Sequence, residues 1–235
     1  MARKLTLTLL RELQDEIVSC RACPRLTRYR EEVARVKRRA FREEIYWGRP
    51  VPGFGDPAAE LVIVGLAPAA HGANRTGRMF TGDRSGDFLF AALHRCGFAN
   101  QALSRSRADG LVLRGAYITA PCRCAPPWNK PLPVELQRCA PFLSRELALL
   151  PRLKVILALG AIGFRAVLDH LARQGQGVPS PRPAFGHGVN IPIGNGRQLL
   201  ASYHVSQQNT QTGKLTPAMF DAVLGQARLW IDKTA

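Results

Sequence analysis

The chain has 235 residues, of which 46% are hydrophobic and 21% are charged, so the composition excludes a disordered chain and allows a sizeable core. No apolar run approaches the roughly 20 residues that a membrane-spanning helix needs. The start of the sequence mixes acids into its apolar spacing, which predicts an amphipathic helix and not a secretion signal. We therefore expect a soluble, cytoplasmic protein with a single domain over residues 1–235 and no contact with membranes.

The charge is strongly basic: 33 Lys and Arg against 17 Asp and Glu give a net charge of +16. This surplus favours a polyanionic partner, although a merely soluble basic surface or a ribosome-adjacent protein would share it. Between His170 and Phe220 the sequence contains no Asp or Glu. The basic residues of that stretch are Arg173, Arg182, Arg197 and Lys214. An acid-free segment of this kind is typical of a surface that faces phosphates.

Hydrophobic spacing predicts alternating helices and strands along the chain. Helices are expected at 5–18, 25–45 (a charged, solvated helix), 86–96, 133–149, 161–173 and 216–232. Short apolar runs predict strands at 61–64, 116–119, 155–159 and 199–202, and the Gly- and Pro-rich residues 174–198 predict a long loop or hairpin. The alternation indicates an α/β fold with a parallel sheet covered on both faces.

Ligands of such sheets bind beyond the carboxyl ends of the strands. The loops that begin at Gly65, Thr119 and Ser202 should therefore converge on one site. The first loop, residues 65–83, has small residues where a backbone can approach a ligand, and it contains Phe80. The last loop brings His204 to the same rim. These residues predict a flat ligand stacked on Phe80 and polarised by His204, although an isolated Phe or His more often has a structural role.

The six cysteines are spaced in a way that suggests a metal site. Cys20 and Cys23 form a CxxC pair after the first helix, and Cys124 and Cys139 flank a Pro-rich segment. Four thiolates could hold zinc or an iron–sulfur cluster, and the spacing alone does not separate the two. Cys122 is an alternative ligand to Cys124. The remaining cysteine, Cys96, is expected to pack in the core.

Four motifs together resemble the uracil-DNA glycosylase superfamily, most closely its family 5, the type B enzymes with an iron–sulfur cluster. The similarity extends from about Cys20 to Pro217. The motifs are YWGRPVPGFGD at 46–56, the segment 65–83, CAPP at 124–127 with Cys139, and HVSxxNTxTG at 204–213.

The resemblance implies a three-layer α/β/α sandwich around a short, mainly parallel four-stranded sheet. It also implies a [4Fe-4S] cluster on Cys20, Cys23, Cys124 and Cys139. The expected activity is that of a monofunctional glycosylase, which flips uracil out of DNA and hydrolyses its N-glycosidic bond. The expected partner is double-stranded DNA with uracil or another deaminated base, or single-stranded DNA, bound by a monomer.

Each candidate site residue has an expected role. His204 stabilises the uracil anion in the transition state. Phe80 stacks on the base, and Gly65, Leu66 and Ala67 line the pocket. The remaining candidates, Gln207, Gln208, Asn209 and Lys214, fill the gap left in the duplex or contact the DNA.

The sequence departs from other families of the superfamily directly after Gly65. Those families place Asp, Glu or Asn there to orient the attacking water, whereas this chain has LAPA, as the resemblance to family 5 leads one to expect. Our candidate for the water is Asn74, with His71 and Asp83 behind it. Asn74 could equally be a turn residue, and Asp83 could equally cap a helix.

The end of the second predicted strand, TAP at 119–121, lacks the amide that some relatives use to recognise uracil. We therefore expect other deaminated bases such as hypoxanthine to be accepted. The alternative function, from a different class, is a non-catalytic iron–sulfur or zinc protein that binds nucleic acid.

Overall fold

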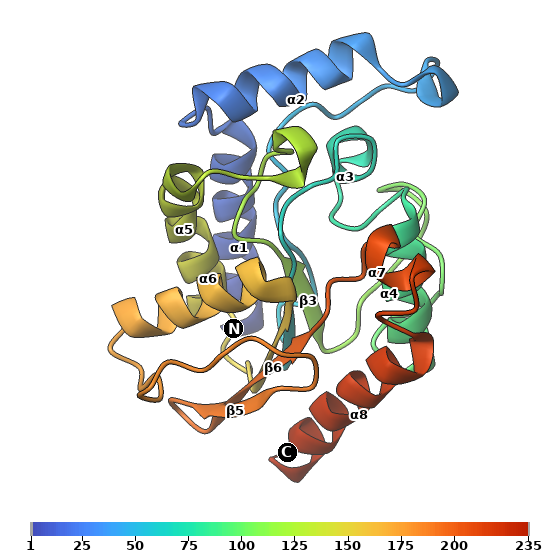
Figure 1. The fold of residues 1–235 in the computed structure, drawn as a ribbon. Coiled ribbons are helices and arrows are strands. Elements are labelled where there is room, and N and C mark those ends of the chain that lie inside the picture. The colour runs from blue at the N-terminus through green and yellow to red at the C-terminus, as the bar shows by residue number, and fades with distance from the viewer. Residues whose placement is uncertain (1, 235) are drawn as a thin grey trace.

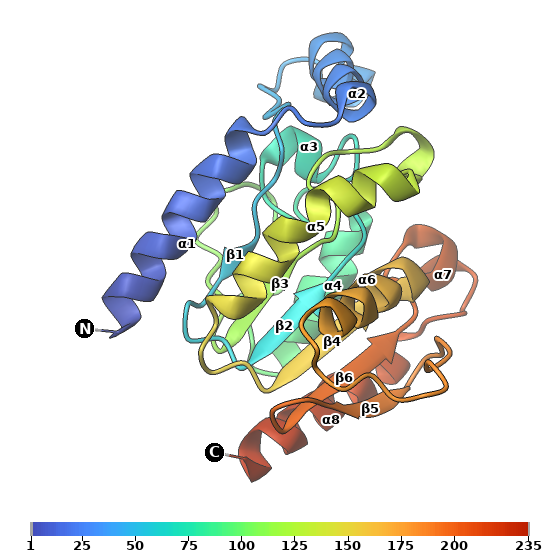
Figure 2. The same ribbon diagram turned by 90° about the vertical axis from the view of Figure 1, so that its left-hand side faces the viewer.

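The computed structural model describes residues 2–234, which form a central six-stranded sheet between two layers of helices (Figures 1 and 2). The strands are β1 (Phe54–Gly55), β2 (Leu61–Val64), β3 (Ala116–Thr119), β4 (Val155–Leu159), β5 (Asn190–Ile193) and β6 (Arg197–Ser202). The α-helices are α1 (Ala2–Ser19), α2 (Pro24–Val36), α3 (Ala73–Thr76), α4 (Arg84–Arg95), α5 (Pro133–Ala148), α6 (Gly160–Arg173), α7 (Gln207–Gln211) and α8 (Pro217–Lys233). Two 3₁₀ turns, η1 (Arg39–Phe41) and η2 (Pro127–Asn129), lie in loops.

The sheet has the order β1-β3-β2-β4-β6-β5, and its four central strands are parallel. These four are the predicted strands, so the parallel centre of the fold is confirmed. The two edge strands are antiparallel; β1 was not predicted, whereas β5 pairs with β6 as in the hairpin alternative expected for residues 174–198. Strand β1 has only two residues, and β5 contains Pro192 within a Gly- and Pro-rich stretch, so neither has the apolar run that identifies a buried strand.

The strands alternate their apolar side chains between two cores. On one face, Leu61 and Ile63 of β2 pack with α4 and α8. On the other, Val62 and Val64 pack with α1, α5 and α6. All four side chains are fully buried, as expected for strands covered on both faces. The predicted three-layer sandwich is confirmed.

The helices differ from the prediction mainly in the charged segment. Helix α2 ends at Val36, not near residue 45, because Lys37 takes a left-handed φ of 60° that stops the helix. Helices α3 and α7 were not predicted, since they have only four and five residues. None of the helices within residues 2–234 combines the length and apolar character that a membrane span needs.

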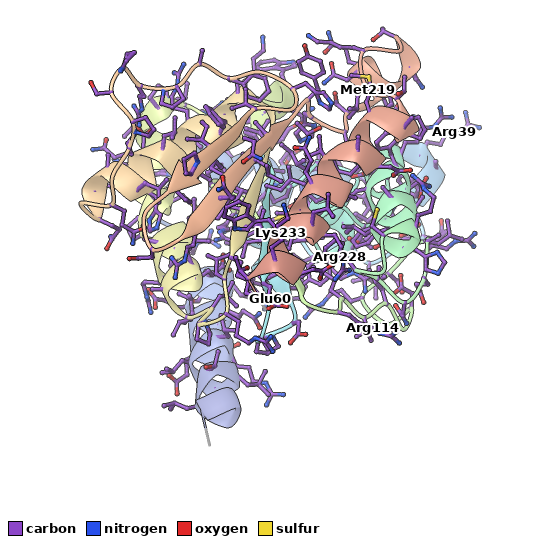
Figure 3. The ribbon with its side chains drawn as sticks, turned by 90° about the horizontal axis from the view of Figure 1, so that it is seen from below. Arg39, Glu60, Arg114, Met219, Arg228 and Lys233 are labelled. Carbon is purple, nitrogen blue, oxygen red and sulfur yellow. The ribbon has the colours of Figure 1, made fainter. Side chains whose placement is uncertain are left out.

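Helix α8 is attached to the end of α4 through Arg228, which Figure 3 labels on the lower side of the molecule. The Arg228 guanidinium donates from Nη2 to the carbonyl of Cys96 at 2.9 Å and lies over the ring of Phe98, 3.9 Å from its centroid. Cys96 itself packs against the core, as predicted. This contact joins the two helices that cover one face of the sheet.

Candidate active site

A pocket of about 390 Å³ lies beyond the carboxyl ends of the parallel strands. Leu66 and Ala67 follow β2, Ala120 follows β3, and His204 follows β6, so the three loops converge as predicted. The other residues that line the pocket are Ala69, Met79, Phe80, Asp83, Ser85, Trp128, Asn129, Lys130, Ser206 and Gln208. A pocket that combines apolar walls with polar side chains such as Asp83 and His204 suits a flat ring with hydrogen-bonding edges, such as a nucleobase.

Phe80 and His204 lie side by side on the wall of this pocket. Their ring centroids are 6.0 Å apart and the ring planes differ by 34°. Gly65 allows this position of Phe80, because a Cβ atom on Gly65 would lie 2.8 Å from Cζ of the Phe80 ring. Phe80 also has a left-handed φ of 52°, which is uncommon for a bulky residue and accompanies functional sites.

The backbone around His204 fixes its ring in the wall. Gly160, with a φ of 85°, lies against His204, and a Cβ on Gly160 would be 3.3 Å from the His204 Cβ. Asn209 donates from Nδ2 to the carbonyl of His204 at 2.8 Å. Burial of the imidazole lowers the pKa of His204 to about 4. The ring is therefore neutral at physiological pH and offers one N–H donor.

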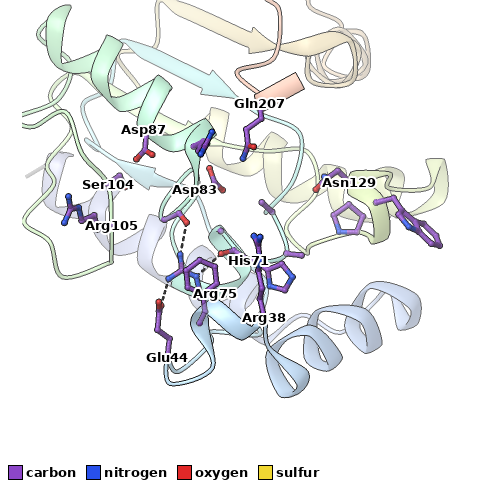
Figure 4. Close-up of a pocket in the computed structure, with 18 of the residues that line it drawn as sticks. Arg38, Glu44, His71, Arg75, Asp83, Asp87, Ser104, Arg105, Asn129 and Gln207 are labelled. Carbon is purple, nitrogen blue, oxygen red and sulfur yellow. Dashed lines mark hydrogen bonds and ion pairs between the residues drawn. The ribbon is translucent and has the colours of Figure 1, made fainter. Parts of the chain in front are cut away.

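A wide groove of about 970 Å³ continues from the pocket (Figure 4). The pocket and the groove share Ala69, Asp83, Trp128 and Asn129 in their walls. Three exposed arginines, Arg38, Arg84 and Arg105, line the groove from three different segments. Its acidic residues are Glu44, Asp83 and Asp87, and Glu44 is paired with Arg75.

The candidates for orienting water occupy different environments. Asn74 is fully buried, its Nδ2 donates to the carbonyls of Arg30 (3.2 Å) and Ala70 (3.4 Å), and it lines neither the pocket nor the groove. His71 lines the groove, with Nδ1 3.1 Å from the hydroxyl of Tyr46. The assignment of Asn74 to the attacking water remains a prediction.

Asp83 lies on the wall that the pocket and the groove share. Its Oδ1 accepts from the backbone N–H of Gly86 at 2.9 Å, so it caps α4. Burial raises the pKa of its carboxyl group. On the other side, a Cβ on Gly72 would lie 1.9 Å from Oδ2, so the loop backbone fits closely around the carboxylate.

The residues expected to contact DNA lie on or after α7. Gln207 lines the groove and Gln208 lines the pocket. Lys214 is exposed and its ammonium lies 4.8 Å from the ring centroid of Tyr203. These roles remain predictions. The roles of Gly65, which lies against Phe80, and of Asn209, which is hydrogen-bonded to His204, also remain predictions.

The cysteines of the CxxC pair and of the Pro-rich segment lie around one small cavity. Cys20, Cys23, Cys122, Cys124 and Cys139 all line it. Burial raises the pKa of Cys124 to about 12 and of Cys139 to about 11, so thiolates there require a compensating positive charge. Within residues 2–234, no three His, Cys, Asp or Glu side chains come close enough together to hold a single metal ion.

Two buried arginines beside the cysteines have N–H groups without a hydrogen-bond acceptor. They are Nε of Arg30, and Nε and Nη1 of Arg123, whose side chains are 2% and 1% exposed. Arg123 lines the cysteine cavity, and the positive charge of Arg30 lowers the pKa of Cys124 against the larger effect of burial. Orphaned donors of buried cations fit an anionic group between the cysteines. A cluster held by four thiolates is such a group, and its ligands bind different irons, so they need not converge on one point.

Trp128, Asn129 and Lys130 line the pocket but were not predicted. Their signal in the sequence is weak, because a Trp and an Asn between prolines are also typical of an ordinary surface loop. Only the fold shows that this segment reaches the mouth of the pocket from the cysteine side.

Comparison with known proteins agrees with this geometry. The sequence model of the Uracil DNA glycosylase superfamily matches residues 52–228 of this chain. The chain belongs to this superfamily. It is 54% identical over 218 residues to a type-5 uracil-DNA glycosylase of Mycobacterium bovis, which covers 92% of this chain and 80% of the relative. It is 53% identical over 212 residues to a type-5 uracil-DNA glycosylase of Thermus thermophilus, covering 90% and 94% of the two chains. The type-5 enzyme of Pyrobaculum aerophilum is 44% identical over 214 residues, with 91% and 89% covered.

Proposed function

We propose that this protein removes uracil from DNA by hydrolysing the N-glycosidic bond and leaves an abasic site for repair. The observation that carries the proposal is the pairing of Phe80 and a neutral, half-buried His204 in one wall of the pocket. The similarity to relatives named type-5 uracil-DNA glycosylases supports the choice of base and reaction.

The chemistry follows from where charge develops. Breaking the bond leaves oxocarbenium character on the sugar and negative charge on the leaving uracil. The neutral His204 ring donates its N–H to a uracil oxygen as that charge forms, in a site with little water. Phe80 stacks on the base, while the backbone at Leu66 and Ala67 borders its edge.

The attacking water requires a polar group near the sugar. Among the candidates, the Asp83 carboxylate lines both the pocket and the groove, which places it where base and sugar would meet. Asn74 lines neither; its Nδ2 donates to backbone carbonyls, and its buried Oδ1 has no hydrogen-bond partner among the described residues. We infer that Asp83 orients the water and that Asn74 holds the loop in shape.

The groove beside the pocket is the proposed path of the DNA. Arg38, Arg84 and Arg105 would contact phosphates, and Gln207 and Gln208 would enter the gap left by the flipped base. The expected substrate is a duplex that contains uracil or another deaminated base. Single-stranded DNA would fit the same groove. The protein would act as a monomer. Hypoxanthine is included because Ala120 offers no side-chain amide that would select uracil.

We infer that Cys20, Cys23, Cys124 and Cys139 hold a [4Fe-4S] cluster, with Arg30 and Arg123 offsetting its negative charge. When bound, such a cluster joins α1, α2, the Pro-rich segment and α5 through four iron–thiolate bonds. Cys122 would stay outside the ligand set, because its Sγ already donates to the carbonyl of Cys124 at 3.3 Å.

The test is release of uracil from a duplex with uracil opposite guanine, measured beside the same duplex with cytosine. We expect abasic sites only in the uracil duplex, and the same assay with hypoxanthine measures the substrate range. Tight binding of the uracil duplex without any release would instead indicate the non-catalytic nucleic-acid-binding protein.

A further inference from the structure

Trp128 is a large aromatic side chain that the fold leaves in solvent. It is 84% exposed, whereas Trp47 and Trp230, the other two tryptophans of the chain, pack against the core. The structure gives its indole no aromatic or cation–π partner among the described residues. An exposed tryptophan with its whole ring free is unusual, because burying it would stabilise the fold.

The backbone that presents Trp128 is held in an unfavourable conformation. Trp128 and Asn129 have φ values of 53° and 57°, a left-handed conformation that is rare for a bulky residue such as tryptophan, whereas asparagine adopts it readily. The neighbouring prolines, Pro126, Pro127 and Pro131, stiffen the segment. Such strain persists where the surrounding structure imposes it, and it accompanies functional sites.

Hydrogen bonds within the segment and from helix α2 hold the backbone around Trp128. Asn129 and Lys130 donate backbone hydrogen bonds to Pro126 (3.2 Å) and Pro127 (3.0 Å). Arg25 of α2 donates from Nη2 to the carbonyl of Lys130 at 3.2 Å and pairs with Glu135. The backbone that presents Trp128 is therefore held in place by hydrogen bonds.

Its position defines what this ring can meet. Trp128 lies in the wall that the base pocket and the arginine-lined groove share. Figure 4 shows its neighbour Asn129 beside the groove, on a different segment of the chain from His71. A DNA strand that follows the groove and places one base in the pocket must pass this wall.

We propose that Trp128 is a stacking site for the nucleobase next to the flipped base on the same strand. Flipping removes one stacking neighbour from that base and exposes its face, and the indole replaces the lost neighbour. The site reads a flat π-face and therefore has no sequence preference. This inference rests on the proposed function, since it requires that the target nucleotide turns out of the duplex toward the pocket.

The test uses DNA in which a tetrahydrofuran abasic analogue replaces the target nucleotide, so that no reaction occurs. A fluorescent 2-aminopurine on its 5′ or 3′ side reports stacking. We expect the wild-type protein to quench 2-aminopurine at one of the two positions. Trp128→Asn, which suits the left-handed backbone but has no ring, should abolish the quenching and weaken binding roughly 5- to 150-fold. Trp128→Phe should restore part of both.

The controls separate the possible failures. Leu229→Ala removes an exposed apolar side chain on the remote helix α8 and should change nothing. Melting temperature and iron content should be equal in all variants. If Trp128→Asn binds and quenches like the wild type while the wild type excises uracil, the stacking site is wrong and the proposed function stands. If the wild type excises no uracil, the proposed function fails independently of Trp128.

Discussion

Asn209 donates a hydrogen bond from its side-chain Nδ2 to the backbone carbonyl of His204, at 2.8 Å. The carbonyl of Asn209 in turn accepts from the N–H of Leu215 at 3.0 Å, so this residue joins the loop after β6 to the start of α8. Its side chain acts on the position of His204 and lies outside the pocket wall.

Asn209→Ala should therefore slow the chemical step by about tenfold, the effect of one lost hydrogen bond, and leave DNA affinity nearly unchanged. Asn209→Asp should be slower still, because its carboxylate would face the His204 carbonyl. Single-turnover rates and binding to abasic-analogue DNA measure the two effects separately. Gln211→Ala on the same helix is the control, and equal losses in rate and affinity would contradict a positioning role.

His204→Ala should lower the single-turnover rate by about 10²–10³-fold and affect binding far less, since the donor matters most once the base becomes an anion. His204→Gln keeps a neutral N–H donor and should retain more activity than alanine. A wild-type rate in His204→Ala would remove this residue from the mechanism.

The pH dependence follows from the environment of the same ring. Burial lowers the pKa of His204 to about 4, below the usual value of 6.5, so the neutral form persists as the pH falls through 6.5. The single-turnover rate should consequently show no loss near pH 6.5 that depends on His204. Comparing wild type with His204→Gln between about pH 5 and 8 tests this, because a step present only in the wild type near 6.5 would show an exposed imidazole.

The purified protein should be brown and contain about four irons per chain. Cys124→Ser should lose iron and stability, whereas Cys122→Ser and Cys96→Ser should keep both. Iron analysis and visible absorption measure this. A colourless protein with one zinc would contradict the cluster.

Glu146 is a buried hydrogen-bond acceptor for Arg123, Tyr117, Thr119 and the backbone of Gly53. Glu146→Ala leaves the Arg123 guanidinium buried without its counter-charge, which should reduce the free energy of unfolding by about 3–5 kcal/mol. Chemical denaturation measures the change. Glu16→Ala, which breaks a half-exposed ion pair with Arg145, is the control and should have little effect.

Removing Arg38, Arg84 or Arg105 should weaken binding of uracil-containing and normal DNA alike. Each loss should reduce the slope of log affinity against log salt by about 1. Lys214→Ala belongs in the same series. Arg152→Ala is the control, because Arg152 does not line the groove. Its side chain is paired with Glu60. An unchanged slope in all groove variants would place the DNA elsewhere.

Sequence patterns predicted the parts of this fold that depend on burial. The apolar runs at 61–64 and 155–159 could only be strands covered on both faces, and their order along the chain set the edge where the site lies. The pocket walls at Leu66 and His204 followed from that edge.

The directions in which individual loop side chains point could not be predicted from the sequence. Asn74 belongs to a four-residue helix that turns its amide into the interior, and no periodicity indicates the orientation of so short a helix. Trp128 resembles an ordinary loop residue until the Pro-rich segment is placed beside the pocket. Lys37 ends α2 through a backbone angle that its side chain does not predict.

The two antiparallel edge strands also affect how copies of this protein meet one another. A long exposed edge strand of either direction would present unpaired N–H and C=O groups to any other chain and favour aggregation. Here one edge is β1, only two residues long, and the other is β5, whose Pro192 has no N–H to donate. In concentrated solutions and refolding mixtures, residues 2–234 therefore offer no continuous strand edge on which an intermolecular sheet could grow.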